Sequence, residues 1–159
     1  MATETKLLTA EDLLRMHSQG VRGELLRGVL CNTMPTGREH GEIAANTAYE
    51  LLNHVKPRKL GIVTTSDSGV RLERDPDTVR EPDVAFFLAQ RIGPERVTTY
   101  SDVVPDLVVE IVSPNDDAEK VYDKARMWLS FGVRLVWVAN PDSPTVAVHR
   151  PARAVDTAS

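Results

Sequence analysis

One acidic residue interrupts the most apolar stretch of the chain. Residues 106–112 read DLVVEIV, a run typical of a central strand that is covered on both faces, and Glu110 stands inside it. An ionised carboxylate at such a position is costly unless it is paired or binds a metal. Because strand alternation gives Glu110 only Val108 and Val112 as neighbours on its own face, its partner must come from another element.

A lysine in the next predicted helix is the candidate partner. Lys124 shares a helix face with Trp128 and so points toward the sheet, where a lysine is unexpected. If the chain reverses at Ser113 and the helix starts near Asp116, Glu110 lies roughly 10 Å back along the strand and Lys124 about 12 Å along the helix. The two side chains are then level, and we predict that they meet.

A second carboxylate stands at the start of another apolar strand. In residues 81–88, EPDVAFFL, Asp83 follows a proline and precedes the strand. Carboxylates from neighbouring strands can hold one or two Mg²⁺ ions, and a nearby lysine can orient the attacking water or stabilise charge on a phosphate. The structural alternative is an ion pair between Glu110 and Lys124, with Asp83 acting only as a turn residue.

Strand and helix patterns surround these residues. The predicted elements, in chain order, are a helix at 10–17, a strand at 24–31, a helix at 41–55, strands at 61–65, 69–72, 84–88 and 106–112, a helix from about 116 to 131, and strands at 134–139 and 145–149. The three runs between 61 and 88 predict a meander or a curved sheet edge. The last two strands predict a hairpin around a Pro-Asp-Ser-Pro turn.

The length and composition fit one globular domain. The 159 residues are 42% apolar and 26% charged, which suits a single hydrophobic core. Cys31 is the single cysteine, so no internal disulfide or cysteine-based zinc cluster can form, and a reducing cytoplasm is the expected setting. We also expect neither a signal peptide nor a membrane-spanning segment.

The net charge of −4 is opposite to that of a protein that coats nucleic acid by charge alone. It counts less against a nuclease, because a carboxylate cluster that holds Mg²⁺ is acidic until the metal neutralises it. Neither a phosphate loop nor a G-x-S-x-G elbow is present, which argues against nucleotide-binding proteins and serine hydrolases. Basic residues that could follow a phosphate backbone, or simply be solvated, are Lys56, Arg58, Lys59, Arg71, Arg74, Arg80, Arg91 and Arg96.

The acidic motifs resemble those of known nucleases. The Pro-Asp step at Asp83 and the Glu-Ile-Val triplet at Glu110 resemble the Asp…Glu-x-Lys core of PD-(D/E)XK nucleases, with Val112 in the lysine position. More closely, PDLVVEIVSPN, YDKAR and GVRLVWVANP resemble the Uma family of putative restriction endonucleases, formerly a domain of unknown function. That family also has valine there and is thought to place its lysine in the following helix, where the matching residue is Lys124.

The resemblance extends over roughly residues 8–150. Glu24, in GELLRG, matches an acidic family position; it could extend the acidic site or be an exposed or ion-paired residue at a strand start. His40, in EHGEIA, matches a recurrent histidine that could contact phosphate or donate to a backbone carbonyl. Family members usually continue into further strands after the last hairpin, so we expect an open sheet edge here that could pair in a homodimer.

These observations lead to one prediction and one alternative. We predict an α/β domain over residues 1–150, with a mixed sheet flanked by helices and a restriction-endonuclease-like core, and a disordered tail at 151–159. The resemblance implies a metal-dependent endodeoxyribonuclease that acts on DNA, with Asp83 and Glu110 holding Mg²⁺ or Mn²⁺, Lys124 positioning the water and Glu24 assisting. The alternative is an inactive nuclease-fold module for protein or nucleic-acid interaction.

Overall fold

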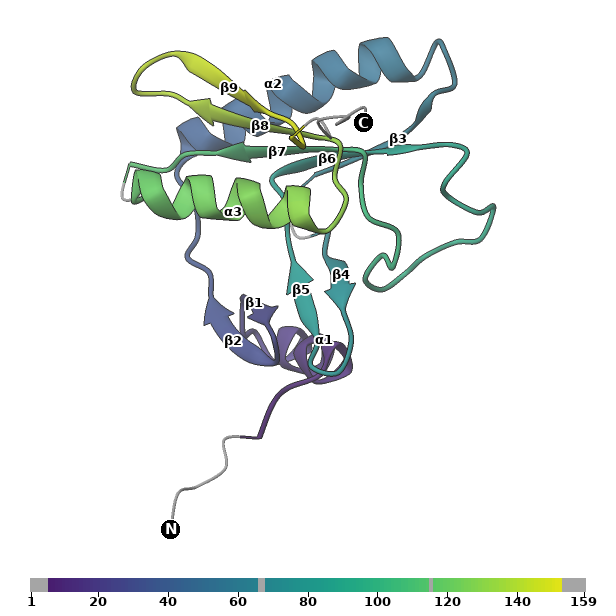
Figure 1. Cartoon of the computed structure of the whole chain (residues 1–159), viewed down its shortest axis with the longest axis vertical. Coiled ribbons are helices and arrows are strands. Elements are labelled where there is room, and N and C mark those ends of the chain that lie inside the picture. The colour runs from purple at the N-terminus through teal and green to yellow at the C-terminus, as the bar shows by residue number, and fades with distance from the viewer. Residues whose placement is uncertain (1–5, 66–67, 115, 153–159) are drawn as a thin grey trace, which may run out of the picture.

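A five-stranded mixed sheet carries most of the molecule. The computed structural model describes residues 6–65, 68–114 and 116–152 (Figure 1). In the order of the sheet, the strands are β3 (Gly61–Thr65), β6 (Val84–Leu88), β7 (Leu107–Ile111), β8 (Leu135–Asn140) and β9 (Thr145–His149). The β7–β8 pair is parallel, because a helix connects these two strands, and the other pairs are antiparallel.

A smaller antiparallel sheet lies below the large one in Figure 1. Its strands, in order, are β2 (Val29–Asn32), β1 (Gly23–Leu26), β5 (Thr78–Arg80) and β4 (Val70–Glu73). Helix α1 (Ala10–Ser18) packs on this sheet around a small core of its own, whose buried members are Ala10, Leu13, Leu25, Val79 and Tyr100.

Two helices cover opposite faces of the large sheet. Helix α2 (Arg38–Val55) packs against β3, β6 and β7, while α3 (Ala118–Ser130) packs against β7, β8 and β9. Alternate residues of β7 belong to the two clusters: Val108 lies with α3 and Val109 with α2. All five residues of β7 are buried, which confirms the prediction of a central strand covered on both sides.

The α/β fold class is confirmed, but the small sheet was not foreseen. The predicted strand at 24–31 is wrong, because two strands are joined there by a tight turn with φ of 49° at Arg27 and 79° at Gly28. The predicted meander is also wrong. Its first and last runs pair with each other as β3 and β6, whereas the middle run, β4, pairs in the other sheet with the unpredicted β5.

The position at which each helix starts is related to the residue at its N-cap. Thr9 and Asp12 cap α1 reciprocally, which sets its start at the predicted residue, Ala10. Helix α2 starts at Arg38, three residues before the predicted start, since its N-cap Gly37 offers no side-chain signal. Asp117 caps α3 by accepting a hydrogen bond from the Glu119 backbone.

The open edge expected after the last hairpin is present in the described part of the chain. Strand β9 has a partner on one side only, and Val146 and Val148 are 56% and 50% exposed. Pairing of this edge with a second copy stays a prediction, as does the single domain.

Most of the predicted tail, residues 153–159, lies outside the described residues. Among those described, no helix is both long and apolar enough to cross a bilayer.

Candidate active site

The predicted site residues come together where the two sheets meet helices α2 and α3. Val84 pairs with Val109, so Asp83, just before β6, lies beside Glu110 at the end of the β6–β7 ladder. Lys124 approaches Glu110 from α3, and Glu24 approaches Lys124 from β1 of the small sheet. Four residues separated by up to 100 positions therefore form one charged cluster.

Glu110 is buried and held at both carboxylate oxygens. The residue is 5% exposed. Its Oε2 accepts a hydrogen bond from Nζ of Lys124 at 2.8 Å, and its Oε1 accepts one from Nε1 of Trp128 at 2.7 Å. Burial raises the pKa of Glu110 above its ordinary value, the Lys124 charge opposes that rise, and the nearby carboxylate of Asp83 adds to it.

Lys124 stands between two carboxylates. Its Nζ lies 2.8 Å from Oε2 of Glu110 and 3.9 Å from Oε1 of Glu24, and its side chain is 24% exposed. Burial by itself lowers the pKa of Lys124, but the charges of Glu110 and then of Glu24 outweigh burial and leave the pKa raised. Lys124 is therefore an ammonium ion throughout the physiological pH range, and the predicted contact with Glu110 is present.

Glu24 connects the small sheet to this cluster. Its Oε1 accepts a hydrogen bond from the backbone N–H of Glu81 at 2.6 Å, and its Oε2 lies 3.2 Å from Nη1 of Arg80. With a side-chain exposure of only 7%, Glu24 is a buried, ion-paired residue that also faces Lys124. The ion-paired alternative is therefore confirmed, an exposed Glu24 is wrong, and its part in an acidic site stays a prediction.

Asp83 is fixed by the backbone and by His40. Its Oδ2 accepts a hydrogen bond from the backbone N–H of Ile111 at 2.7 Å and lies 3.3 Å from Nε2 of His40. The hydrogen bond with Asp83 raises the pKa of His40, while partial burial opposes the rise. His40 comes from the first turns of α2 and is directed at the carboxylate, so Asp83 does more here than begin a strand.

The donor set suits a hard divalent cation held in part by solvent and substrate. Mg²⁺ and Mn²⁺ prefer carboxylate oxygens, and Mg²⁺ is commonly held by one or two carboxylates, waters and phosphate oxygens. Asp83 and Glu110 provide two such carboxylates side by side. Within the described ranges, however, no three His, Cys, Asp or Glu side chains form a ready-made metal cage. Each oxygen of Glu110 accepts one hydrogen bond and keeps a second lone pair, so a cation at Oε2 would bind next to Lys124 or displace it.

Two members of the site were missed from the sequence. Trp128, assigned only to the core-facing helix stripe, donates to Glu110, and the signal for this was its position four residues after Lys124. Arg80 was grouped with basic residues that might follow a phosphate backbone, but it pairs with Glu24. No local sequence signal joins Arg80 to Glu24, because the two lie on strands 56 residues apart in the sequence.

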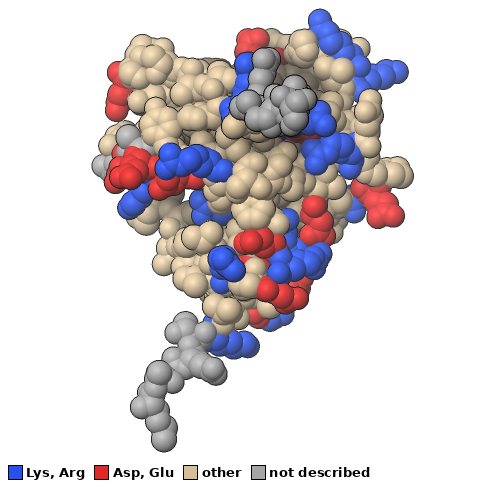
Figure 2. All heavy atoms as spheres, in the orientation of Figure 1, with Lys and Arg blue, Asp and Glu red and all other residues tan. Residues whose placement is uncertain are grey.

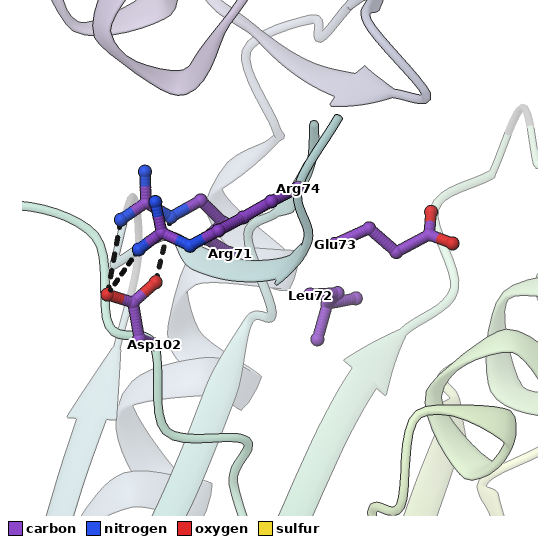
Figure 3. A pocket seen from close by; sticks show the side chains of 5 residues that line it. All are labelled: Arg71, Leu72, Glu73, Arg74 and Asp102. Carbon is purple, nitrogen blue, oxygen red and sulfur yellow. Dashed lines mark hydrogen bonds and ion pairs between the residues drawn. The ribbon is translucent and has the colours of Figure 1, made fainter. Parts of the chain in front are cut away.

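Other arginines of the predicted basic group are also engaged by carboxylates. Figure 3 shows a surface pocket in which Arg71 and Arg74 both reach Asp102. Arg91 is paired in the same way with Asp106. The pocket at Asp102 contains none of the predicted catalytic residues, and its two guanidinium groups are paired with Asp102 and, at Arg71, also with Glu11. It therefore offers no second candidate for the active site.

Comparisons with known proteins identify the family and the fold. A family model described as "Putative restriction endonuclease" matches residues 10–157. A solved structure described as a putative nuclease belonging to DUF820 from Anabaena variabilis matches with a TM-score of 0.75 and 24% identity, over 92% of this chain and 82% of that chain. This structural likeness shows the fold, and no match was found among curated proteins. The family model spans nearly the whole sequence, so the chain belongs to the Uma family of putative restriction endonucleases.

Proposed function

We propose that the protein is a metal-dependent endonuclease that hydrolyses phosphodiester bonds in DNA. The observation that carries the proposal is the buried Glu110 beside Asp83, with the ammonium group of Lys124 2.8 Å from Glu110. A buried acid with a raised pKa, a second acid and a lysine in one cluster form the kind of constellation found at catalytic sites. Membership in a family described as restriction endonucleases supports phosphodiester chemistry for that cluster.

Each side chain has a distinct role in this proposal. Asp83 and Glu110 hold Mg²⁺ or Mn²⁺, which when bound polarises the phosphate and makes a coordinated water more acidic. Lys124, kept positive by Glu110 and Glu24, orients the attacking water or stabilises the negative charge on the phosphate in the transition state. Glu24 assists as the second carboxylate next to Lys124, 3.9 Å from its Nζ.

His40 acts on Asp83 in this scheme. Its Nε2 lies 3.3 Å from Oδ2 of Asp83, the oxygen that also accepts the Ile111 N–H. These two contacts hold Oδ2 of Asp83 in place before substrate arrives. Preorganised ligands of this kind reduce the cost of binding a cation. Contact between His40 and a phosphate of the substrate remains a further prediction.

The second candidate function is a non-catalytic interaction module that keeps the nuclease fold. One observation favours it: both Glu110 oxygens are satisfied by side chains of α3, as in a structural ion pair. Under this alternative Lys124 neutralises Glu110 permanently, and the site takes no metal.

Calorimetric titration with Mg²⁺ and Mn²⁺ separates the two functions. The wild type is compared with Asp83→Asn, with Glu110→Gln, and with the control Glu95→Gln, which removes an exposed acid outside the cluster. The nuclease proposal expects binding by the wild type and the control, loss of binding in both site variants, and metal-dependent nicking of supercoiled plasmid. A folded wild type that binds neither ion would favour the interaction module.

A further inference from the structure

A tryptophan lies deep in the site without a role in the function proposed above. Trp128 is fully buried in α3, and its Nε1 donates to Oε1 of Glu110 at 2.7 Å. Lys124, one turn earlier on the same helix face, takes the other oxygen, Oε2. One helix therefore supplies a separate donor to each oxygen of the same buried carboxylate.

The two donors differ in how easily they can move away from the Glu110 carboxylate. The indole N–H can only donate and keeps its proton at any physiological pH, and the Trp128 ring is packed among Val108, Val133 and Val136. Lys124 ends a flexible four-carbon stem and keeps 24% of its side chain exposed. The Oε1 contact is thus the fixed one, and the Oε2 contact is the exchangeable one.

Packing alone does not explain an indole at this position. A phenyl ring would fill much of the same apolar space, whereas a buried indole N–H needs an acceptor, and here that acceptor is the acid of the site. From this geometry we infer that Trp128 is a positioning residue for Glu110. By holding Oε1, it fixes the carboxylate plane so that Oε2 faces Lys124 or, given the proposed function, the cation.

The first test observes this hydrogen bond in the metal-free protein. The chain has two tryptophans, so a proton–nitrogen NMR spectrum has two indole signals, which Trp137→Phe assigns. We expect the Trp128 signal downfield of the Trp137 signal, slow to exchange with solvent, and shifted upfield in Glu110→Gln. A Trp128 signal that does not respond to Glu110→Gln overturns the inference, whether or not the protein is a nuclease.

The second test measures Mn²⁺ affinity by calorimetry. Trp128→Phe keeps a ring and removes the donor, and Trp137→Phe is the matched control on the opposite face of the sheet. Loss of a residue that orients a metal ligand typically weakens metal binding by about 10–100-fold, so we expect a loss of that size for Trp128→Phe and none for the control. Trp128→Tyr, which restores a ring donor, should recover part of the affinity.

These outcomes separate the inference from the proposed function. A merely structural role for Trp128 would lower the melting temperature of Trp128→Phe without changing the affinity of its folded fraction, and that result overturns the inference. If the wild type binds no Mn²⁺, the proposed function fails, and the metal-free NMR test alone decides the role of Trp128. The same NMR test decides it if Trp128→Phe does not fold.

Discussion

Removal of the Lys124 charge should destabilise the protein in a strongly pH-dependent way. In Lys124→Met the buried carboxylate of Glu110 keeps the Trp128 N–H but loses its counter-ion. The variant loses less stability if Glu110 takes up a proton, and burial already favours this because it raises the pKa of Glu110. The free energy of protonation therefore sets a ceiling on the loss of stability.

The ceiling follows from the distance between the pH and the ordinary glutamate pKa of 4.5. At about 1.4 kcal/mol per pH unit, protonation of Glu110 costs at most about 3.5 kcal/mol at pH 7 and about 0.7 kcal/mol at pH 5. Because the folded-state pKa is raised, the folded variant holds a proton that the unfolded chain releases. Its stability relative to the wild type therefore falls as the pH rises from about 4.5 toward the folded pKa.

Urea unfolding at pH 5 and at pH 7 measures this difference. We expect Lys124→Met to lose about 2–3 kcal/mol at pH 7 and under about 1 kcal/mol at pH 5. The control Lys120→Met, an exposed lysine of the same helix, should change stability by less than about 0.5 kcal/mol. An equal loss at both pH values, or no loss at pH 7, would refute the claim that Lys124 neutralises a buried carboxylate.

Three further predictions concern the site and its substrate. Asp83→Asn keeps the shape of the side chain and should lower plasmid nicking at least about 100-fold, with a melting temperature close to that of the wild type; unchanged nicking would remove Asp83 from the site. Arg80→Met removes the nearer cation of the buried Glu24 and leaves Lys124, 3.9 Å away, as the other, so it should cost up to about 3 kcal/mol by urea unfolding, whereas a neutral result would mean that Glu24 does not need Arg80 as a counter-ion. Figure 2 shows basic side chains interspersed with acidic ones, so duplex binding by fluorescence anisotropy should depend weakly on salt, with a log–log slope between about −2 and −4; a slope near −8 would reveal a continuous phosphate-binding surface.

The local part of the site could be predicted from the sequence. Glu110 and Lys124 are 14 residues apart on a strand and the helix that follows it, so strand rise and helix rise are enough to place them level. The same reasoning held for the central strand, the β8–β9 hairpin and the start of α1. In each case the geometry depends on neighbouring residues only.

The long-range part could not be predicted, because periodicity does not encode which distant strands pair. Leu25 pairs with Val79 across 54 residues, and this pairing brings Glu24 and Arg80 together. The three-residue strand β5 is too short to give an alternation pattern, and the turn at Arg27–Gly28 lacks the Asn-Gly or Asp-Gly pair typical of such turns. The contact between Trp128 and Glu110 was not predicted, for another reason. The apolar ring of Trp128 is enough to explain its place on the buried helix face, so that place does not by itself indicate the hydrogen bond of its N–H.

The ion pair between Lys124 and Glu110 also affects how the protein folds. Many metal sites gather like charges that repel one another until the ion arrives, and such proteins unfold when a chelator removes it. Here the chain carries its own cation next to the buried acid, and Arg80 does the same for Glu24. We therefore expect the native structure to form without divalent ions, and treatment with EDTA should leave its melting temperature unchanged.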